Sequence, residues 1–195
     1  MSNIAVEHAE NDSKTIFGFW VYIMTDCVLF ASLFAAFAVL RHNTYGGPGA
    51  EDLFSLPFVL TETLILLTSS FTCGLAMLAA RQKNREMVLK LLGLTFLLGL
   101  AFLTLELREF NHLAAEGNSW RRSGFLTSFF TLVGTHGAHI SVGLIWMGTM
   151  MIRIYRVGFF KSSIKKLTML SLFWHFLDIV WIFIFTIVYM MGAIQ

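Results

Sequence analysis

This chain of 195 residues carries little charge, few cysteines and few prolines. Charged residues make up 13% of the sequence, whereas soluble domains average about 25%. The low charge excludes an ordinary soluble protein. The longest polar segments leave no room for a separate soluble domain; they are residues 1–15, 42–56, 112–123 and 153–167. The two cysteines, Cys27 and Cys73, lack the Cys-x-x-Cys spacing of a redox motif.

Motifs that would point to catalysis within this chain are also missing. The sequence has no glycine-rich phosphate loop before a helix, no Cys-x-x-Cys-His for covalent haem attachment and no convincing pair of nucleophile and base. We therefore expect no catalytic residue, no metal site and no cofactor in this chain.

Long apolar stretches fill almost all of the sequence. Each is long enough to cross a bilayer, which takes about 20 helical residues. In lipid the backbone must satisfy its own hydrogen bonds, so these stretches are expected to be helices. The five expected spans are Ile16–Leu40, Pro57–Ala80, Val88–Asn111, Gly124–Ile152 and Thr168–Met191.

The sequence thus predicts an all-α integral membrane bundle of five transmembrane helices. Residues 1–15 are expected to form a polar cytoplasmic tail, and residues 16–195 a single transmembrane domain. The first apolar run is longer than a signal-peptide core and lacks a small-x-small cleavage site, so we expect it to be retained. With the N-terminus cytoplasmic, ten of the 14 Lys and Arg residues lie on the cytoplasmic side. The positive-inside rule favours this orientation and places the C-terminus in the periplasm.

A few ionisable residues lie inside these spans, where each costs at least about 2.5 kcal/mol near the bilayer centre and usually faces the protein interior. The expected topology sorts them by depth. An inner layer would hold Asp26, His175 and Asp178, and an outer layer Glu62 and Glu106. His136 and His139 lie near mid-depth on the fourth span.

The histidines permit more than one interpretation. His136 and His139 are three residues apart on one helix, so they point the same way and cannot hold one haem from opposite faces. They are either a metal clip, which needs further ligands, or buried structural side chains. His175 and Asp178 also share a helix face, and they form either a proton relay or a hydrogen-bonded pair that joins two helices.

Glu62 is the most informative single residue, because apolar residues flank it on both sides in Leu60-Thr61-Glu62-Thr63-Leu64. Its carboxyl group has two functional interpretations, proton handling and binding of a lipid head group. The structural interpretation is a protonated carboxyl group that is hydrogen-bonded across helices.

Five ordered segments together resemble subunit III of the haem–copper respiratory oxidases. The strongest matches are Phe173-Trp174-His175-Phe176-Leu177-Asp178-Ile179-Val180-Trp181 and Gly134-Thr135-His136-Gly137-Ala138-His139-Ile140. Phe17-Gly18-Phe19-Trp20 leading to Asp26, the Glu62 segment, and Glu106-Leu107-Arg108-Glu109-Phe110 also fit. The chain is most similar to the cytochrome bo type, the ubiquinol oxidase branch, because two spans found in many cytochrome c oxidase subunits do not precede the first one here.

The resemblance implies a place in the bacterial inner membrane, in a complex that oxidises ubiquinol, reduces oxygen to water and pumps protons. It implies that the haems and copper belong to subunit I, the main partner, and that subunits II and IV complete the complex. The chain itself would stabilise subunit I and bind phospholipid. Glu62 would contribute to a lipid cleft or a subunit contact, while Asp26, Glu106, His136, His139, His175 and Asp178 would be buried structural groups.

Two alternatives remain at this point. One is the same accessory role in a cytochrome c oxidase. The other, of a different class, is a proton-coupled transporter or channel subunit that uses Glu62 and the His175–Asp178 pair. Such transporters usually contain an internal repeat, and we find none in this sequence.

Overall fold

The computed structural model of the chain describes residues 2–46, 56–158 and 161–192. This part is helical apart from short turns. The helices are α1 (Ser2–Leu40), α3 (Leu56–Arg81), α4 (Arg85–Ala115), α5 (Gly124–Val157) and α6 (Lys161–Ile184), which continues as the π-helical segment η1 (Phe185–Met190). Five helices are long and apolar enough to cross a membrane. The predicted five-span helical bundle is therefore confirmed at this level.

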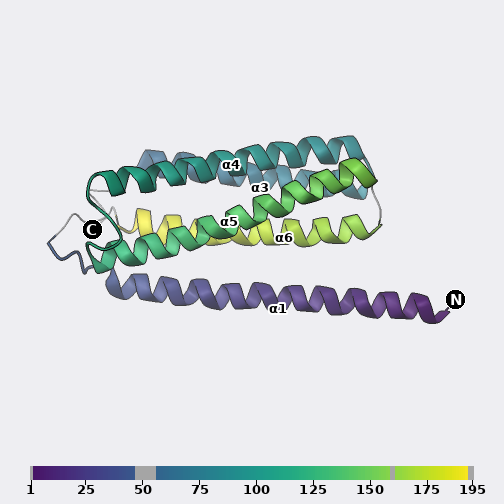
Figure 1. Ribbon diagram of the computed structural model, residues 1–195, viewed down its shortest axis with the longest axis horizontal. Helices are drawn as coiled ribbons and strands as arrows, with labels where there is room; N and C mark the ends of the chain where they lie inside the picture. The colour runs from purple at the N-terminus through teal and green to yellow at the C-terminus, as the bar shows by residue number, and fades with distance from the viewer. Residues whose placement is uncertain (1, 47–55, 159–160, 193–195) are drawn as a thin grey trace.

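The helices run up and down along one long axis (Figure 1). Helices α3, α4, α5 and α6 form a four-helix bundle, in which α3 contacts α4 and α6 while α5 contacts α4 and α6. Helix α1 lies along one side of this bundle, where it packs against α5 and α6. The two ends of the chain lie at opposite ends of the molecule (Figure 1). Because only α5 and α6 pack against it, much of the surface of α1 is left uncovered by the rest of the chain.

Helix α1 is longer than the span expected from hydropathy, because it begins at Ser2 rather than at Ile16. The segment before Ile16 is polar but contains neither proline nor glycine, so nothing in its backbone chemistry ends the helix there. The apolar part that is long enough to span a membrane is Lys14–Leu40.

Local sequence signals explain where the other helices begin. Pro57 occupies the first turn of α3, where its missing N–H costs no helical hydrogen bond. The Asn84 side chain accepts a hydrogen bond from the Met87 backbone N–H at 3.2 Å and caps α4. Ser123 does the same for α5 through the Leu126 N–H, also at 3.2 Å.

The centre of the four-helix bundle holds two fully buried tryptophans of α6, Trp174 and Trp181. Trp174 fits because α4 and α5 present glycines to it. A Cβ atom added at Gly99 would lie 2.8 Å from the Trp174 Cη2 atom, and one at Gly143 would lie 3.1 Å from its Cζ3 atom. The glycines thus let three helices approach around one indole ring.

The last turns of the chain form a π-helix, which the sequence analysis does not predict. In η1 the Met191 N–H donates to the Thr186 carbonyl, five residues earlier, at 3.0 Å. The wider turn carries Tyr189, whose side chain is buried and reaches α4. π-Helical turns are rare and occur frequently at functional sites.

Candidate functional site: polar side chains buried between the helices

A carboxyl cluster lies between α3, α4 and η1 and consists of Glu62, Glu106 and Glu109. Glu62 and Glu106 are 0% and 2% exposed, and none of their oxygens has a hydrogen-bond partner among the described residues. The three acids are close enough for Coulombic interaction with one another. The Tyr189 hydroxyl donates to the Glu109 Oε2 atom at 3.0 Å. The structure thus brings Glu62 and Glu106 into one layer.

The carboxyl group of Glu106 has room because Gly137 faces it from α5. A Cβ atom at Gly137 would lie 2.8 Å from the Glu106 Oε1 atom. His136, the neighbouring residue of α5, is fully buried, and neither ring nitrogen has a hydrogen-bond partner among the described residues. Its ring stacks on Trp181 with centroids 5.3 Å apart. The surroundings of His136 are therefore aromatic rather than those of a ligand set.

A second polar contact joins α1 to the bundle. The Asp26 Oδ1 atom lies 3.6 Å from the His139 Nε2 atom of α5. The His139 Nδ1 atom is 2.7 Å from the Thr135 carbonyl oxygen, which can only accept, so Nδ1 carries the proton of that bond. Asp26 therefore pairs with His139.

A third polar group links α3 to α6 and consists of Ser70, His175 and Asp178. The Ser70 Oγ atom lies 2.7 Å from the His175 Nδ1 atom, and Asp178 follows His175 by about one turn of α6. His175 thus contacts α3, whereas the expected inner layer would have joined it and Asp178 to Asp26. The reason is the arrangement of the helices, because α6 packs against both α1 and α3 and His175 faces the α3 side.

Hydroxyl groups of α3 also bind the two buried indoles. Trp174 Nε1 donates to Ser69 Oγ at 3.0 Å, and Trp181 Nε1 donates to Thr63 Oγ1 at 3.1 Å. Each hydroxyl in turn donates to a backbone carbonyl of its own helix. Both indole N–H groups are satisfied, which burial in a bundle requires.

These contacts favour joining of helices over chemistry. Among the described residues no group of three or more His, Cys, Asp or Glu side chains is arranged to hold a metal ion. The sequence drew attention to the acids and histidines but not to their partners Ser70, Thr63 and Tyr189. Single hydroxyls in apolar helices are common and often bond their own backbone, so the sequence carries no signal that would have singled these out.

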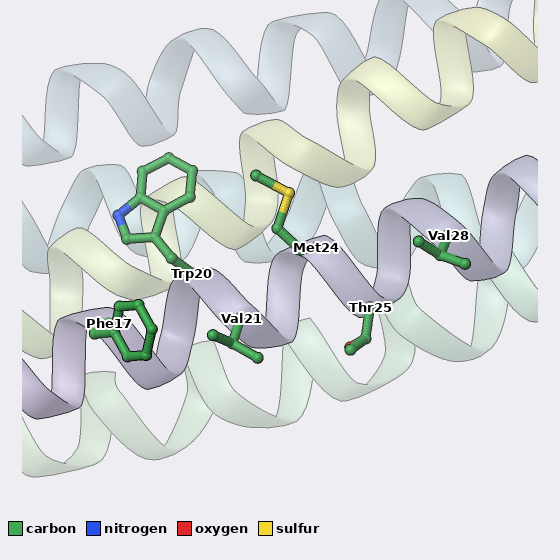
Figure 2. Close-up of a pocket in the computed structure, with 6 residues that line it drawn as sticks. All are labelled: Phe17, Trp20, Val21, Met24, Thr25 and Val28. Atoms are coloured by element: carbon green, nitrogen blue, oxygen red, sulfur yellow. The ribbon is translucent and has the colours of Figure 1, made fainter.

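The outer surface of α1 has an apolar hollow (Figure 2). Its lining side chains all come from α1 itself: Phe17, Trp20, Val21, Met24, Thr25 and Val28. Helices α5 and α6 cover the opposite side of α1. This hollow belongs to the apolar surface that α1 presents to lipid or to another chain.

The chain matches the family described as Cytochrome c oxidase subunit III over residues 2–193. It is 56% identical over 189 residues to cytochrome bo(3) ubiquinol oxidase subunit 3 of Pseudomonas aeruginosa, covering 96% of this chain and 90% of that protein. The corresponding protein of Pseudomonas putida is 51% identical, with 95% and 89% covered. Cytochrome c oxidase subunit 3 of Bacillus sp. PS3 is 45% identical, with 91% and 86% covered.

Proposed function

Because the chain belongs to the cytochrome c oxidase subunit III family, we propose that it is the non-catalytic subunit 3 of a proton-pumping terminal ubiquinol oxidase. The observation that carries this proposal is the similarity, 56% and 51% identity over almost the whole chain, to subunit 3 of two cytochrome bo(3) ubiquinol oxidases. As a bacterial oxidase subunit with five candidate spans, the chain is a multi-pass protein of the plasma membrane. The other subunits of the oxidase are its partners.

The proposed role is to brace the catalytic subunit. The contacts around Ser70, His139 and Tyr189 support it, because each ties a deep polar side chain to a neighbouring helix. The haems and copper are proposed to reside in the large partner subunit, subunit I, which also forms the main contact. Subunits II and IV would complete the complex.

The proposed orientation places the N-terminus in the cytoplasm and the C-terminus in the periplasm. It is supported by the basic turn between α3 and α4, with Arg81, Lys83 and Arg85, and by the basic residues at the end of α5 and the start of α6. These segments belong to the same end of the bundle as the N-terminus. The positive-inside rule assigns that end to the cytoplasm.

Phospholipid is a proposed partner at a groove between the first turns of the α1 span and of α6. Its walls are apolar, and Lys165 lies among them at the proposed cytoplasmic end. The lining residues are Ile16, Phe19, Trp20, Lys165, Thr168, Met169 and Leu172. An acyl chain would follow the apolar walls, and an anionic head group would lie near Lys165 and the tryptophan, as is common at membrane interfaces.

Glu62 does not line the lipid groove. Its side chain is fully buried within the bundle, so a direct contact with lipid would need a path through the packed helices. The role in lipid binding or subunit contact implied by the resemblance stays a prediction. The burial favours an indirect effect, in which Glu62 positions α3 and thereby the surfaces around it.

Oxygen consumption by membranes from a strain that lacks only this chain tests the proposal. We expect ubiquinol-driven oxygen consumption through this oxidase to fall when the chain is missing and to return when it is supplied on a plasmid. If the missing chain instead lowers oxygen consumption driven by reduced cytochrome c and leaves ubiquinol-driven consumption unchanged, the complex is a cytochrome c oxidase. The similarity to subunit 3 of the Bacillus cytochrome c oxidase is the reason for testing this alternative. An unchanged rate with either donor would contradict both.

A further inference from the structure

We propose that Asp26 of α1 and His139 of α5 together bind one proton, which they share across the contact between the two helices. We call these two side chains the Asp26–His139 pair. The inference goes beyond the proposed function, because it depends on where the pair lies within the membrane spans and not on the electron donor of the oxidase. Hydrogen-bond chemistry, net charge and the packing around the pair each support it.

The His139 ring is oriented by a carbonyl oxygen of its own helix. Its Nδ1 atom lies 2.7 Å from the Thr135 carbonyl oxygen, and a carbonyl oxygen accepts hydrogen bonds but never donates them. Nδ1 therefore carries a proton in this arrangement. The other ring nitrogen, Nε2, has only a lone pair while the imidazole is neutral, and it gains an N–H group when the ring becomes an imidazolium ion.

The Nε2 atom of His139 faces the carboxyl group of Asp26. The Asp26 Oδ1 atom lies 3.6 Å from it, which is within ion-pair distance. An ionised carboxylate only accepts hydrogen bonds, so beside a neutral ring two lone pairs would face each other. One added proton removes this conflict wherever it resides. On Asp26 it makes the carboxyl group a donor to Nε2, and on His139 it makes Nε2 a donor to the carboxylate.

The same proton cancels the net charge of the pair at a depth where charge is costly. Asp26 lies near the middle of the candidate span Lys14–Leu40, and His139 lies near the middle of Gly124–Val157. An ionised Asp26 beside a neutral ring has a net charge of minus one, whereas the pair with one added proton is neutral overall. Between described residues, no lysine or arginine forms an ion pair with Asp26. An uncompensated charge near the bilayer centre is strongly unfavourable, so the pair retains the proton.

The packing around the pair keeps the two side chains together. The side chains of His139 and Asp26 are 18% and 9% exposed. The Asp26 Oδ2 atom is buried and has no hydrogen-bond partner within the described part of the chain. Phe30 of α1 covers the imidazole, with ring centroids 5.2 Å apart. The proton is therefore held between the aspartate and the histidine.

The other titratable groups nearby do not take over this role. Tyr22 lies one turn before the aspartate on α1, and a phenol is uncharged near neutral pH. His136 lies one turn before the histidine on α5, but it is fully buried and neither of its nitrogens has a hydrogen-bond partner among the described residues. Helix α6 contributes the rings of Phe173 and Phe176, which contact rings of α1, while its His175 faces a hydroxyl of α3.

The shared proton helps to attach α1 to the bundle. Helix α1 packs against α5 and α6, and the ring contacts that join it to α5 elsewhere are apolar, as between Phe19 and Trp146 and between Phe37 and Phe125. Loss of the proton would leave a buried negative charge opposite a lone pair. The polar contact between α1 and α5 thus depends on protonation of the pair.

Two amide substitutions in the purified complex test the shared proton. Asp26→Asn places an amide N–H group beside the neutral ring, and His139→Asn places one beside the ionised carboxylate. Each variant can therefore keep a hydrogen bond across the contact without the added proton. Infrared difference spectra of the unaltered complex minus each variant, recorded at neutral pH in H₂O and in D₂O, locate the proton in the unaltered complex.

We expect the unaltered complex to show either the carbonyl band of a protonated carboxyl group or the ring bands of an imidazolium ion, and we expect both substitutions to remove the same bands. Cys27→Ala is the control, because its exposed thiol adjoins Asp26 in the sequence but contributes no band of either kind. Each variant alone assigns the bands, so the test holds when only one of them assembles.

Three results would overturn the inference. A carboxylate band from Asp26 without imidazolium bands from His139 would show that the pair lacks the proton. A protonated carboxyl band together with imidazolium bands would show that it holds two. Bands that one substitution removes and the other leaves in place would show that the proton belongs to one residue alone. None of these results bears on the electron donor, so the proposed function is tested separately.

Discussion

Glu62, Glu106 and Glu109 bring three carboxyl groups into the interior of a membrane bundle. Ionised carboxylates that share a buried site repel one another, and no lysine or arginine joins them among the hydrogen bonds and ion pairs of the described residues. We therefore expect the cluster to hold protons rather than three negative charges. The Tyr189 hydroxyl donates a hydrogen bond to one of the three acids, Glu109, at 3.0 Å.

Replacing Glu62 by glutamine tests this view of the cluster. An amide has nearly the shape of a protonated carboxyl group, so Glu62→Gln should leave assembly and maximal ubiquinol oxidation essentially unchanged. Glu62→Ala should lower the stability of the complex by about 2 kcal/mol or more, because it leaves a cavity in the packed bundle. Oxygen uptake and the thermal unfolding midpoint of the purified complex measure the two effects. Complete loss of oxygen reduction by an assembled Glu62→Gln complex would contradict this account.

At the level of single residues the sequence identified the acids and imidazoles but not their contacts. Glu62 was visible because a lone acid in an apolar run is costly. Its neighbours came from the packing of α3, α4 and η1, which the sequence does not encode in any short motif. The pairing of Asp26 with His139 in place of His175 has the same origin, since both α5 and α6 contact α1.

Among the helices, the contact of α4 and α5 with α6 depends on glycines that face Trp174. A methyl group at Gly99 would come within 2.8 Å of the indole, and Leu144 would crowd it at 3.0 Å. The helices can keep their present spacing only if this position has no side chain. The tryptophan fills the space that the glycine leaves.

Gly99→Ala should therefore destabilise the bundle, by about 1–3 kcal/mol relative to a matched control. Gly148→Ala is that control, because an added Cβ there would meet only Phe96 Cε2 at 3.8 Å, an ordinary contact. Both variants gain the same helix propensity from alanine, roughly 1 kcal/mol, so their difference isolates the crowding. Thermal unfolding of the solubilised complexes gives the comparison, and equal midpoints would show that Trp174 moves aside without cost.

The helices themselves were largely predictable, because length and apolarity suffice to define membrane spans. Helices α3 and α5 each begin within one residue of the start that the sequence predicts. The early start of α1 at Ser2 was not visible from hydropathy, which reports burial in lipid and not helix formation. The π-helix of η1 was not visible either, because no residue type in Phe185–Met190 signals the wider turn.

At the scale of the whole molecule, the termini lie at opposite ends of the bundle. The proposed orientation follows from the bias of Lys and Arg toward one end. Tyr45 lies in the turn after α1, and Gln82 lies in the turn between α3 and α4, at the other end of the helices. Both side chains are exposed, so they report on opposite sides of the membrane.

Single cysteines at these two positions, in a chain whose Cys27 and Cys73 are replaced by alanine, test the orientation. A membrane-impermeant maleimide applied to intact spheroplasts should label Tyr45→Cys and leave Gln82→Cys unlabelled. Permeabilisation should make Gln82→Cys reactive, which controls for its accessibility. Labelling in the reverse order would place the N-terminus in the periplasm.

The most direct test of the central claim is the haem and copper content of the purified complex, assigned subunit by subunit. Tagged chain isolated from membranes in mild detergent should bring with it a larger subunit that carries the haems and copper. After the subunits are separated, this chain should contain neither metal. Stoichiometric iron or copper on this chain, or purification of the chain without a haem-bearing partner, would contradict the account.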